Sequence, residues 1–443
     1  MIEFILIILQ FFVLSLLFLF PITPHINDRY LGKYNFDIYN ILTINIILNL
    51  NIYLIISIFI SDIKSLFFIN IGLALFFIFI NLKKNTLYFK SIDWRLLFLF
   101  FIINISFFTS LAEDPKLNWD GVVQWLPKAS TYFQGLGFTN VGAYSYPHLG
   151  GFLWGYFWKN SILEMEYAGR FFYIFFYVLS VFSLINILKH KKKLNFLTIT
   201  IFVIFIISIT YDKFLFGGYQ DTLLFSLIII ASNLLYLINI KKYQSFFTYF
   251  LFFLSAFICC WIKQEGLIYF TFLTLILILF EKSTKNKIVF LIFTLILLIN
   301  YFLLRNYLIG EIQFDQKLDF KIFKLLDFNF VINILSSLIF NMIAAMLKYP
   351  IWLLILFFIF ISLFTKKYLH EMRYIYFFLV LNLIFIFFII FYSCLNLNFE
   401  TCSLIMRVSM DRILYQSSGF YLVWIIYLFN NLKFFDSSRS YLG

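Results

Sequence analysis

The sequence predicts an all-α protein, a polytopic transmembrane helical bundle of about 13 spans with short amphipathic helices in its first large extracytoplasmic loop. Two observations carry this prediction. The 443 residues are 63% hydrophobic and 13% charged, so the chain is far more apolar than an ordinary globular domain. The apolar residues also form uninterrupted blocks of roughly 17 to 24 residues, the length of a helix that crosses a bilayer. The short alternating segments of a transmembrane barrel are not found.

The apolar blocks follow one another along the whole chain. They lie near residues 2–20, 38–61, 66–82, 96–112, 167–188, 194–211, 222–240, 246–262, 267–280, 288–304, 350–365, 374–393 and 419–435. A further apolar segment, 331–347, is harder to place. We expect it to lie along the outer interface or to re-enter, because the remaining blocks then alternate consistently across the membrane.

Basic clusters indicate the orientation, because loops on the cytoplasmic side of a membrane carry an excess of Lys and Arg. On this assignment most Asp and Glu residues fall on the outer side. The net charge of +12 then reflects cytoplasmic loops and gives no reason to expect a nucleic-acid partner. The basic clusters lie at residues 83–95, 189–193, 241–242, 281–287, 365–373 and in the C-terminal tail.

The chain is expected to divide into three parts, with no internal repeat and no soluble domain. Residues 1–95 form an N-terminal scaffold of transmembrane helices, and residues 436–443 form a cytoplasmic tail. Between them lies a transmembrane module, 96–435, which carries the polar groups of the outer face. Its three longer outer loops are expected at residues 113–166, 305–330 and 394–418.

The four cysteines do not have the spacing of a zinc site. Cys394 and Cys402 share the last expected outer loop. Without geometry, the seven residues between them leave open whether they form a disulfide.

The first outer loop differs most from the rest of the chain, because it holds half of the Pro and half of the Trp residues. Residues 120–134 have the apolar spacing of a short amphipathic helix. Asp120 stands at its start, where a carboxylate suits the helix dipole. Asp120 is therefore either the cap of an interfacial helix or a functional carboxylate, and the Trp residues are either membrane anchors or ligand contacts.

Other charged residues of the outer face have two readings as well. Asp221, where an outer turn enters a span, is either an ordinary helix-start carboxylate or a second functional acid. Lys263 and Glu265 are either a boundary ion pair or ligand contacts. The outer cations best placed to hold an anion are Arg170, Lys263, Arg305, Arg407 and Arg412.

Several motifs together resemble the GT-C superfamily of integral-membrane glycosyltransferases, which includes the protein O-mannosyltransferase and lipid A aminoarabinose transferase groups and many bacterial relatives. The resemblance covers roughly residues 96 to 430. It is carried by "WDGVVQWLPKASTYF" at 119–133, "YPHLGGFLWGYFWK" at 146–159 followed by Arg170, "FGGYQDTLLF" at 216–225, "KQEGLIYF" at 263–270 and "MDRILYQ" at 410–416.

The resemblance implies a reaction on the extracytoplasmic face. A sugar would pass from a polyprenyl-phosphate donor to an acceptor hydroxyl, with inversion, and Asp120 would act as the general base. Better-known members carry an Asp-Glu pair in this loop and fewer preceding spans. Here Gly121 follows Asp120, so Glu113 and Asp114 stay alternative catalytic carboxylates.

The resemblance also implies a set of substrate-binding residues. Cations such as Lys263, Arg407 and Arg412 would bind the leaving phosphate, and Asp221 and Glu265 would contact the sugar or the acceptor. Two aromatic-loop residues are further candidates, Tyr146 and His148, although His148 also fits as a histidine packed on aromatic rings. No cofactor is implied with certainty, and the need for a divalent metal ion is left open.

The implied setting is the inner (plasma) membrane of a bacterium, with a multi-pass chain surrounded by lipids and its active site facing the periplasm or the exterior. The acceptor would be a glycan, a lipid or a protein. Two other functions stay open. An O-antigen-type polymerase or ligase would depend mainly on Arg407 and Arg412 in the last outer loop. A transporter or lipid flippase would bind its substrate near the membrane midplane.

Overall fold

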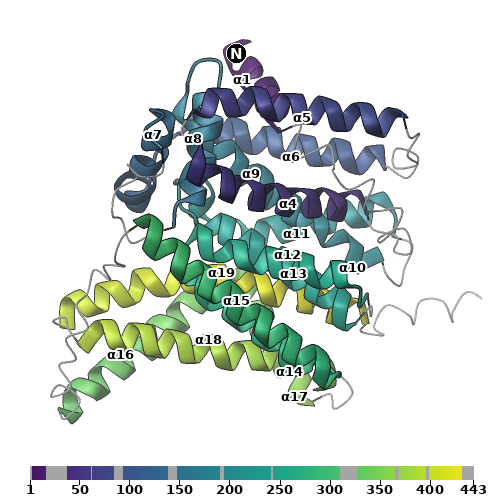
Figure 1. The fold of residues 1–443 in the computed structure, drawn as a ribbon. Coiled ribbons are helices and arrows are strands. Elements are labelled where there is room, and N and C mark those ends of the chain that lie inside the picture. The colour runs from purple at the N-terminus through teal and green to yellow at the C-terminus, as the bar shows by residue number, and fades with distance from the viewer. Residues whose placement is uncertain are drawn as a thin grey trace, which may run out of the picture.

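A computed structural model shows the protein to be helical wherever regular structure is assigned in the described residues, as the sequence predicts (Figure 1). The described residues are 2–15, 37–60, 62–83, 93–137, 147–189, 194–240, 243–309, 327–364, 369–395 and 399–431. The expected cytoplasmic tail, 436–443, and the central part of the second expected outer loop, 310–326, lie outside them.

Four described helices precede the segment expected to form the first long outer loop. They are α1 (Ile2–Leu14), α4 (Ile38–Phe59), α5 (Ile63–Lys83) and α6 (Trp94–Glu113). A π-helical turn, η3 (Gly121–Trp125), then leads into two short helices outside the long spans, α7 (Leu126–Phe133) and α8 (Leu149–Lys159).

The remaining helices form the body of the bundle. In chain order they are α9 (Glu166–Ser183), α10 (Ile185–Lys189), α11 (Phe196–Thr210), the 3₁₀ turn η5 (Lys213–Leu215), α12 (Asp221–Asn239), α13 (Phe246–Ile262), α14 (Glu265–Phe280), α15 (Thr284–Ile309), α16 (Phe328–Lys348), α17 (Pro350–Phe364), α18 (Leu369–Leu395) and α19 (Phe399–Asn431).

Seven of the described helices are long and apolar enough to cross a membrane: α4, α5, α6, the continuous segment of α9 and α10, α12, α15 and α16. Shorter apolar helices such as α13 and α14 lie among them. The apolar side chains on the outside of α5 and α15 are exposed, as expected for helices that face lipid. These features describe a membrane protein.

α12 is the centre of the bundle. It is buried along its whole length and packs against α9, α13, α14 and α19. Because α12 begins at Asp221, the first residue of the most enclosed helix is a carboxylate. A buried carboxylate is costly unless cations and hydrogen-bond donors contact it, so the stability of the centre of the fold depends on which side chains contact Asp221.

Different segments of the chain lie at the two ends of the bundle (Figure 1). α7, α8, the start of α19 and α16 lie at the left of the view. The helix ends that border the basic clusters lie at the right, near α10. At that right-hand end Lys189 pairs with Asp37 at 3.1 Å, which joins the end of α10 to the start of α4.

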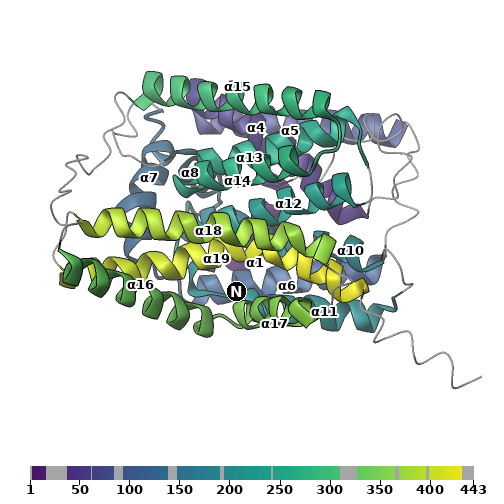
Figure 2. The ribbon, with the colours of Figure 1, turned by 90° about the horizontal axis from the view of Figure 1, so that it is seen from below.

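α16 contains the segment 331–347 and is followed directly by α17 (Figure 2). Pro350 begins α17, a position that proline tolerates because the first helical turn needs no N–H donor there. The junction lies beside α19, where Lys348 pairs with Asp411 and the Trp352 indole donates to the Leu414 carbonyl at 3.1 Å. Together α16 and α17 follow most of the length of α19.

α19 is longer than the sequence suggests. The segment 394–418 is expected to be an outer loop, but the structure is helical from Phe399 onward. Its sequence is polar, yet it contains no Gly or Pro that would end a helix. A disulfide between Cys394 and Cys402 joins the end of α18 to the first turn of α19.

The disulfide leads to a labelling prediction. Denatured protein treated with a maleimide should take up two labels per chain without reductant, on Cys259 and Cys260, and four after reduction. Intact-mass spectrometry reads the number directly. The control variant Cys402→Ser should show three labels without reductant, because it releases the Cys394 thiol. Four labels on the unreduced wild-type protein would contradict the pairing.

Candidate functional site

Five charged side chains that the sequence places in four separate motifs meet at the end of the bundle that carries α7 and α8. We call them the charged cluster: Asp120, Asp221, Lys263, Glu265 and Arg412. Asp120 precedes the π-helical turn, Asp221 and Glu265 begin α12 and α14, Lys263 directly follows α13, and Arg412 lies within α19.

Asp221 is the buried floor of the cluster. Its Oδ1 lies 2.7 Å from the Lys263 Nζ and 3.4 Å from the Arg412 Nε, and the Gln416 side-chain amide also donates to it. The side chains of Asp221 and Lys263 are 0% exposed. A charge removed from water in this way is tolerated only with close partners of opposite sign, which the cluster supplies.

The edge of the cluster is more accessible than its floor. The Arg412 Nη1 lies 2.5 Å from the Asp120 Oδ2, and these side chains are 14% and 13% exposed. The Glu265 Oε1, on a side chain that is 24% exposed, lies 3.1 Å from the same Lys263 Nζ that pairs with Asp221. The Arg412 guanidinium also lies over the Tyr219 ring, 5.3 Å from its centroid. Asp120 therefore stands at the exposed edge of an ionic network whose other end is buried.

Two loops that pack backbone to backbone hold the aspartates close together. The Asn118 N–H donates to the Gly217 carbonyl at 3.0 Å, two residues before Asp120 and four before Asp221. A side chain on Gly121 would collide with that same Gly217 carbonyl. Gly218 has a φ of +78°, a conformation that side chains rarely adopt. The glycines thus allow an approach that larger residues would prevent.

Arg170 in α9 is fully buried and does not face the exposed edge of the cluster. It donates to the Pro115 carbonyl at 2.7 Å, to the Lys116 carbonyl at 3.5 Å and to the Phe216 carbonyl. Its charge is paired with Glu166 at 2.8 Å. The sequence analysis named Arg170 as a cation that could hold an anion. In the structure its N–H groups instead bind backbone carbonyls of the two loops that carry Asp120 and Asp221.

The alternative carboxylates lie apart from the cluster. Glu113 ends α6 and is exposed, and the exposed Asp114 pairs with Lys116 at 3.4 Å. Arg407 is exposed on α19 and takes no part in the ion pairs that join the described residues of the cluster. The sequence could not separate Arg407 from Arg412, because it predicted a loop at this place. On the helix that the structure shows, a separation of five positions puts the two side chains on different faces. Tyr146 lies outside the described residues.

His148 is a buried residue packed among aromatic rings. Its Nε2 lies 2.9 Å from the Ser57 Oγ, and the Trp261 ring meets it edge-on at 5.5 Å between centroids. Burial, with a smaller effect of the nearby Lys128 charge, lowers the pKa of the His148 imidazole to about 3. The ring is therefore neutral at physiological pH, and its surroundings match the structural alternative that the sequence left open.

Lys128 and Arg305 lie near His148 and are also buried. The Lys128 Nζ donates to the Pro147 carbonyl at 3.2 Å, which ties α7 to the start of α8. Burial, followed by the positive charge of Arg305, lowers the pKa of the Lys128 amine to about 7. Arg305, near the end of α15, donates to the Tyr301 hydroxyl.

Sequence reasoning missed two members of the site. Gln416 lies four residues after Arg412, and this spacing places both side chains on the same face of α19. Tyr219 lies two residues before Asp221 and contributes a ring face to Arg412. The helical spacing could have identified Gln416, whereas the position of Tyr219 depends on the fold of its loop.

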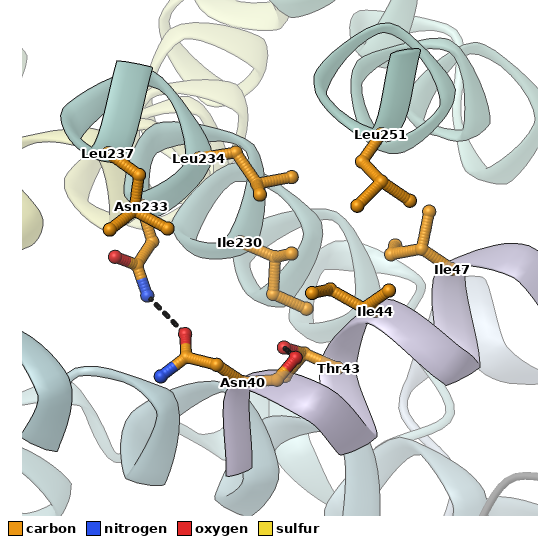
Figure 3. A pocket seen from close by; sticks show the side chains of 9 residues that line it. All are labelled: Asn40, Thr43, Ile44, Ile47, Ile230, Asn233, Leu234, Leu237 and Leu251. Atoms are coloured by element: carbon orange, nitrogen blue, oxygen red, sulfur yellow. Dashed lines mark hydrogen bonds between the residues drawn. The ribbon is translucent and has the colours of Figure 1, made fainter. Parts of the chain in front are cut away.

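The described residues contain no metal centre, and a small cavity lies away from the cluster. Within the described ranges, no three His, Cys, Asp or Glu residues are grouped closely enough to hold a metal ion. A small cavity of about 10 Å³ lies elsewhere, between α4, α12 and α13 (Figure 3). Asn233 donates to Asn40 at 3.1 Å beside it, about 18 Å along α12 from Asp221. The cavity has room for one water molecule at most.

Comparisons with protein-family models, curated proteins and solved structures give no match to this chain.

The close approach of the two loops predicts that adding one methyl group at Gly121 destabilises the protein. Gly121→Ala should lower the free energy of unfolding by about 1–3 kcal/mol, because the Gly217 carbonyl must move. Thermal unfolding in detergent, followed by tryptophan fluorescence, measures the change. The matched control is Gly72→Ala in α5, where no atom lies within 4 Å of the added carbon. Equal stability of the two variants would contradict the loop packing.

The buried ion pair predicts strong energetic coupling. Lys263→Met should destabilise the fold by about 3–5 kcal/mol, because the buried Asp221 loses its nearest cation. The double variant Asp221→Asn, Lys263→Met should lose less than the two single variants combined. Unfolding in mixed micelles measures each value. Lys348→Met, whose side chain is 48% exposed, is the control and should change stability by less than about 1 kcal/mol. Additive effects at Asp221 and Lys263 would contradict the coupling.

Proposed function

We propose that this protein is a membrane glycosyltransferase similar to the GT-C superfamily. It moves a sugar from a polyprenyl-phosphate donor to an acceptor hydroxyl at the extracytoplasmic face of a bacterial inner membrane. The observation that carries the proposal is the meeting of Asp120, Asp221, Lys263 and Arg412. Four motifs spread over about three hundred residues of sequence supply these side chains, and one ionic network joins them.

The proposed reaction is a direct displacement. The acceptor oxygen forms a bond to the anomeric carbon while the bond from that carbon to the phosphate oxygen breaks. The acceptor proton passes to the Asp120 carboxylate, and polyprenyl phosphate leaves with the bonding electron pair. Attack from the face opposite the phosphate inverts the anomeric configuration. A general base of this kind contributes about 10²- to 10⁴-fold to the rate.

Arg412 is the proposed partner of the leaving phosphate. Its guanidinium has several N–H donors, and those near Asp120 lie at the accessible edge of the cluster. A phosphate at this edge would compete with Asp120 for the guanidinium and so release the carboxylate for the acceptor. Asp221 holds the inner side of Arg412 throughout, and Lys263 adds positive charge behind it.

The orientation follows from two features at opposite ends of the bundle. The Cys394–Cys402 disulfide joins the end of α18 to the first turn of α19, and such bonds persist in oxidising compartments. The basic clusters border the other end, which favours the cytoplasm. We propose on this basis that the active site of this chain, which has about 13 spans, faces the periplasm or the exterior.

The position of the charges favours an enzyme over a transporter. Transporters generally bind their substrate near the membrane midplane, between repeats. Here the cluster lies where outer loops join helix ends, at the first residues of α12 and α14. An O-antigen-type polymerase or ligase would also use Arg412, so the role of Asp120 separates that function from the proposed one.

The proposal predicts that Asp120→Asn reduces transfer by at least about 10²-fold, because the amide cannot accept the proton. Purified protein is incubated with labelled sugars on polyprenyl phosphate and a membrane extract as acceptor source, and labelled product is counted. Asp114→Asn, which makes the same change on an exposed carboxylate, should transfer at the wild-type rate. A wild-type transfer rate in Asp120→Asn would show that Asp120 is not the general base. Loss of transfer in Asp114→Asn alone would assign that role to Asp114.

A further inference from the structure

We infer that Arg170 is a positioning residue that sets the distance between Asp120 and Asp221 by binding the backbones of both loops. It contacts neither aspartate in the described structure. Its guanidinium instead donates to Pro115 and Lys116 before Asp120, and to Phe216 before Asp221. The part of this inference that concerns catalysis rests on the proposed function, whereas the part that concerns loop geometry does not.

The chemistry of the arginine side chain suits this role. A guanidinium is planar and carries five N–H donors in a fixed fork, so one side chain can bind several carbonyls in defined directions. Arg170 is 0% exposed and is fixed from below by Glu166, one helical turn earlier at 2.8 Å. Its cation also lies 5.8 Å from the centre of the Trp154 ring. The Arg170 guanidinium is therefore held in one position, and the loops that bind it are restrained with it.

The path from Arg170 to the aspartates is short. Asp120 lies four positions after Lys116, and Asp221 lies five positions after Phe216. Between these points the loops contact each other through the Asn118 N–H and the Gly217 carbonyl. Both aspartates then meet on Arg412. Because catalysis requires reacting groups to be placed within about 1 Å, a loosened clamp would reduce the rate even with every cluster residue present.

Arg170→Lys tests the clamp, because lysine keeps the charge but loses the fork. The readout is the rate of disulfide formation between the loops in a background carrying Asn118→Cys and Gly217→Cys. A Cβ on Gly217 would lie 3.1 Å from the Asn118 Cβ, slightly closer than the roughly 3.5–4.5 Å of a disulfide, so a small separation of the two loops brings the two sulfur atoms into bonding range. Under mild oxidation, followed by peptide mass spectrometry, Arg170→Lys should slow this cross-link about tenfold.

Two further variants complete the test. Arg95→Lys, the same change at an exposed site at the other end of α6, is the matched control and should leave the cross-linking rate unchanged. Glu166→Gln, which releases Arg170 but keeps its fork, should slow the rate by a smaller factor and is used if Arg170→Lys does not fold. Equal cross-linking rates with and without the change at Arg170 or Glu166 would overturn the inference.

The catalytic consequence is measured separately. Without the engineered cysteines, Arg170→Lys should lower kcat about 10- to 100-fold while the donor KM changes little. In the cysteine background, oxidation should restore kcat, because the disulfide replaces the clamp. A kcat that stays low in the cross-linked protein would overturn a positioning role. If the wild-type chain transfers no sugar, the proposed function fails, and the cross-linking rates still decide whether Arg170 clamps the loops.

Discussion

The buried carboxylate of Asp221 is the constraint on which the end of the bundle that carries the charged cluster depends. It begins the most enclosed helix and is removed from water, so it requires cations and hydrogen-bond donors from its neighbours. Lys263 supplies one cation from the end of α13, and Arg412 and Gln416 supply further donors from α19. Satisfying one charge therefore fixes three helices relative to one another, and the same bonds aim Arg412 at Asp120.

The site combines a rigid floor with an accessible edge. Coulomb attraction is stronger in the buried part, where water does not screen it, and weaker where Asp120 and Arg412 approach the surface. An anion that enters from outside would therefore meet the pair that is easier to rearrange. Behind that pair, the Arg170 contacts and the glycine-rich loop packing hold the backbone in place. This division suits a site that must exchange partners without losing its geometry.

Much of the helical framework could be predicted because the apolar blocks are long and local in sequence. The motif positions also identified the members of the charged cluster before any geometry was known. The roles of particular residues were harder to foresee. His148 is packed among rings, and Arg170 binds carbonyls, because both side chains are enclosed by helices distant in sequence. The polar segment 399–418 continues a helix, since composition alone does not show where a helix without Gly or Pro ends.

By itself, the sequence determined that the chain is a helical membrane protein and which charged residues lie near the ends of its apolar segments. Hydrophobic length and charge asymmetry act locally, so they can be read directly from the order of residues. Only the tertiary structure decided that Asp120 and Asp221 share Arg412, that Arg407 lies outside their network and that two loops meet through glycines. Those outcomes depend on the packing of helices from distant parts of the chain, which sets the partners of each buried charge.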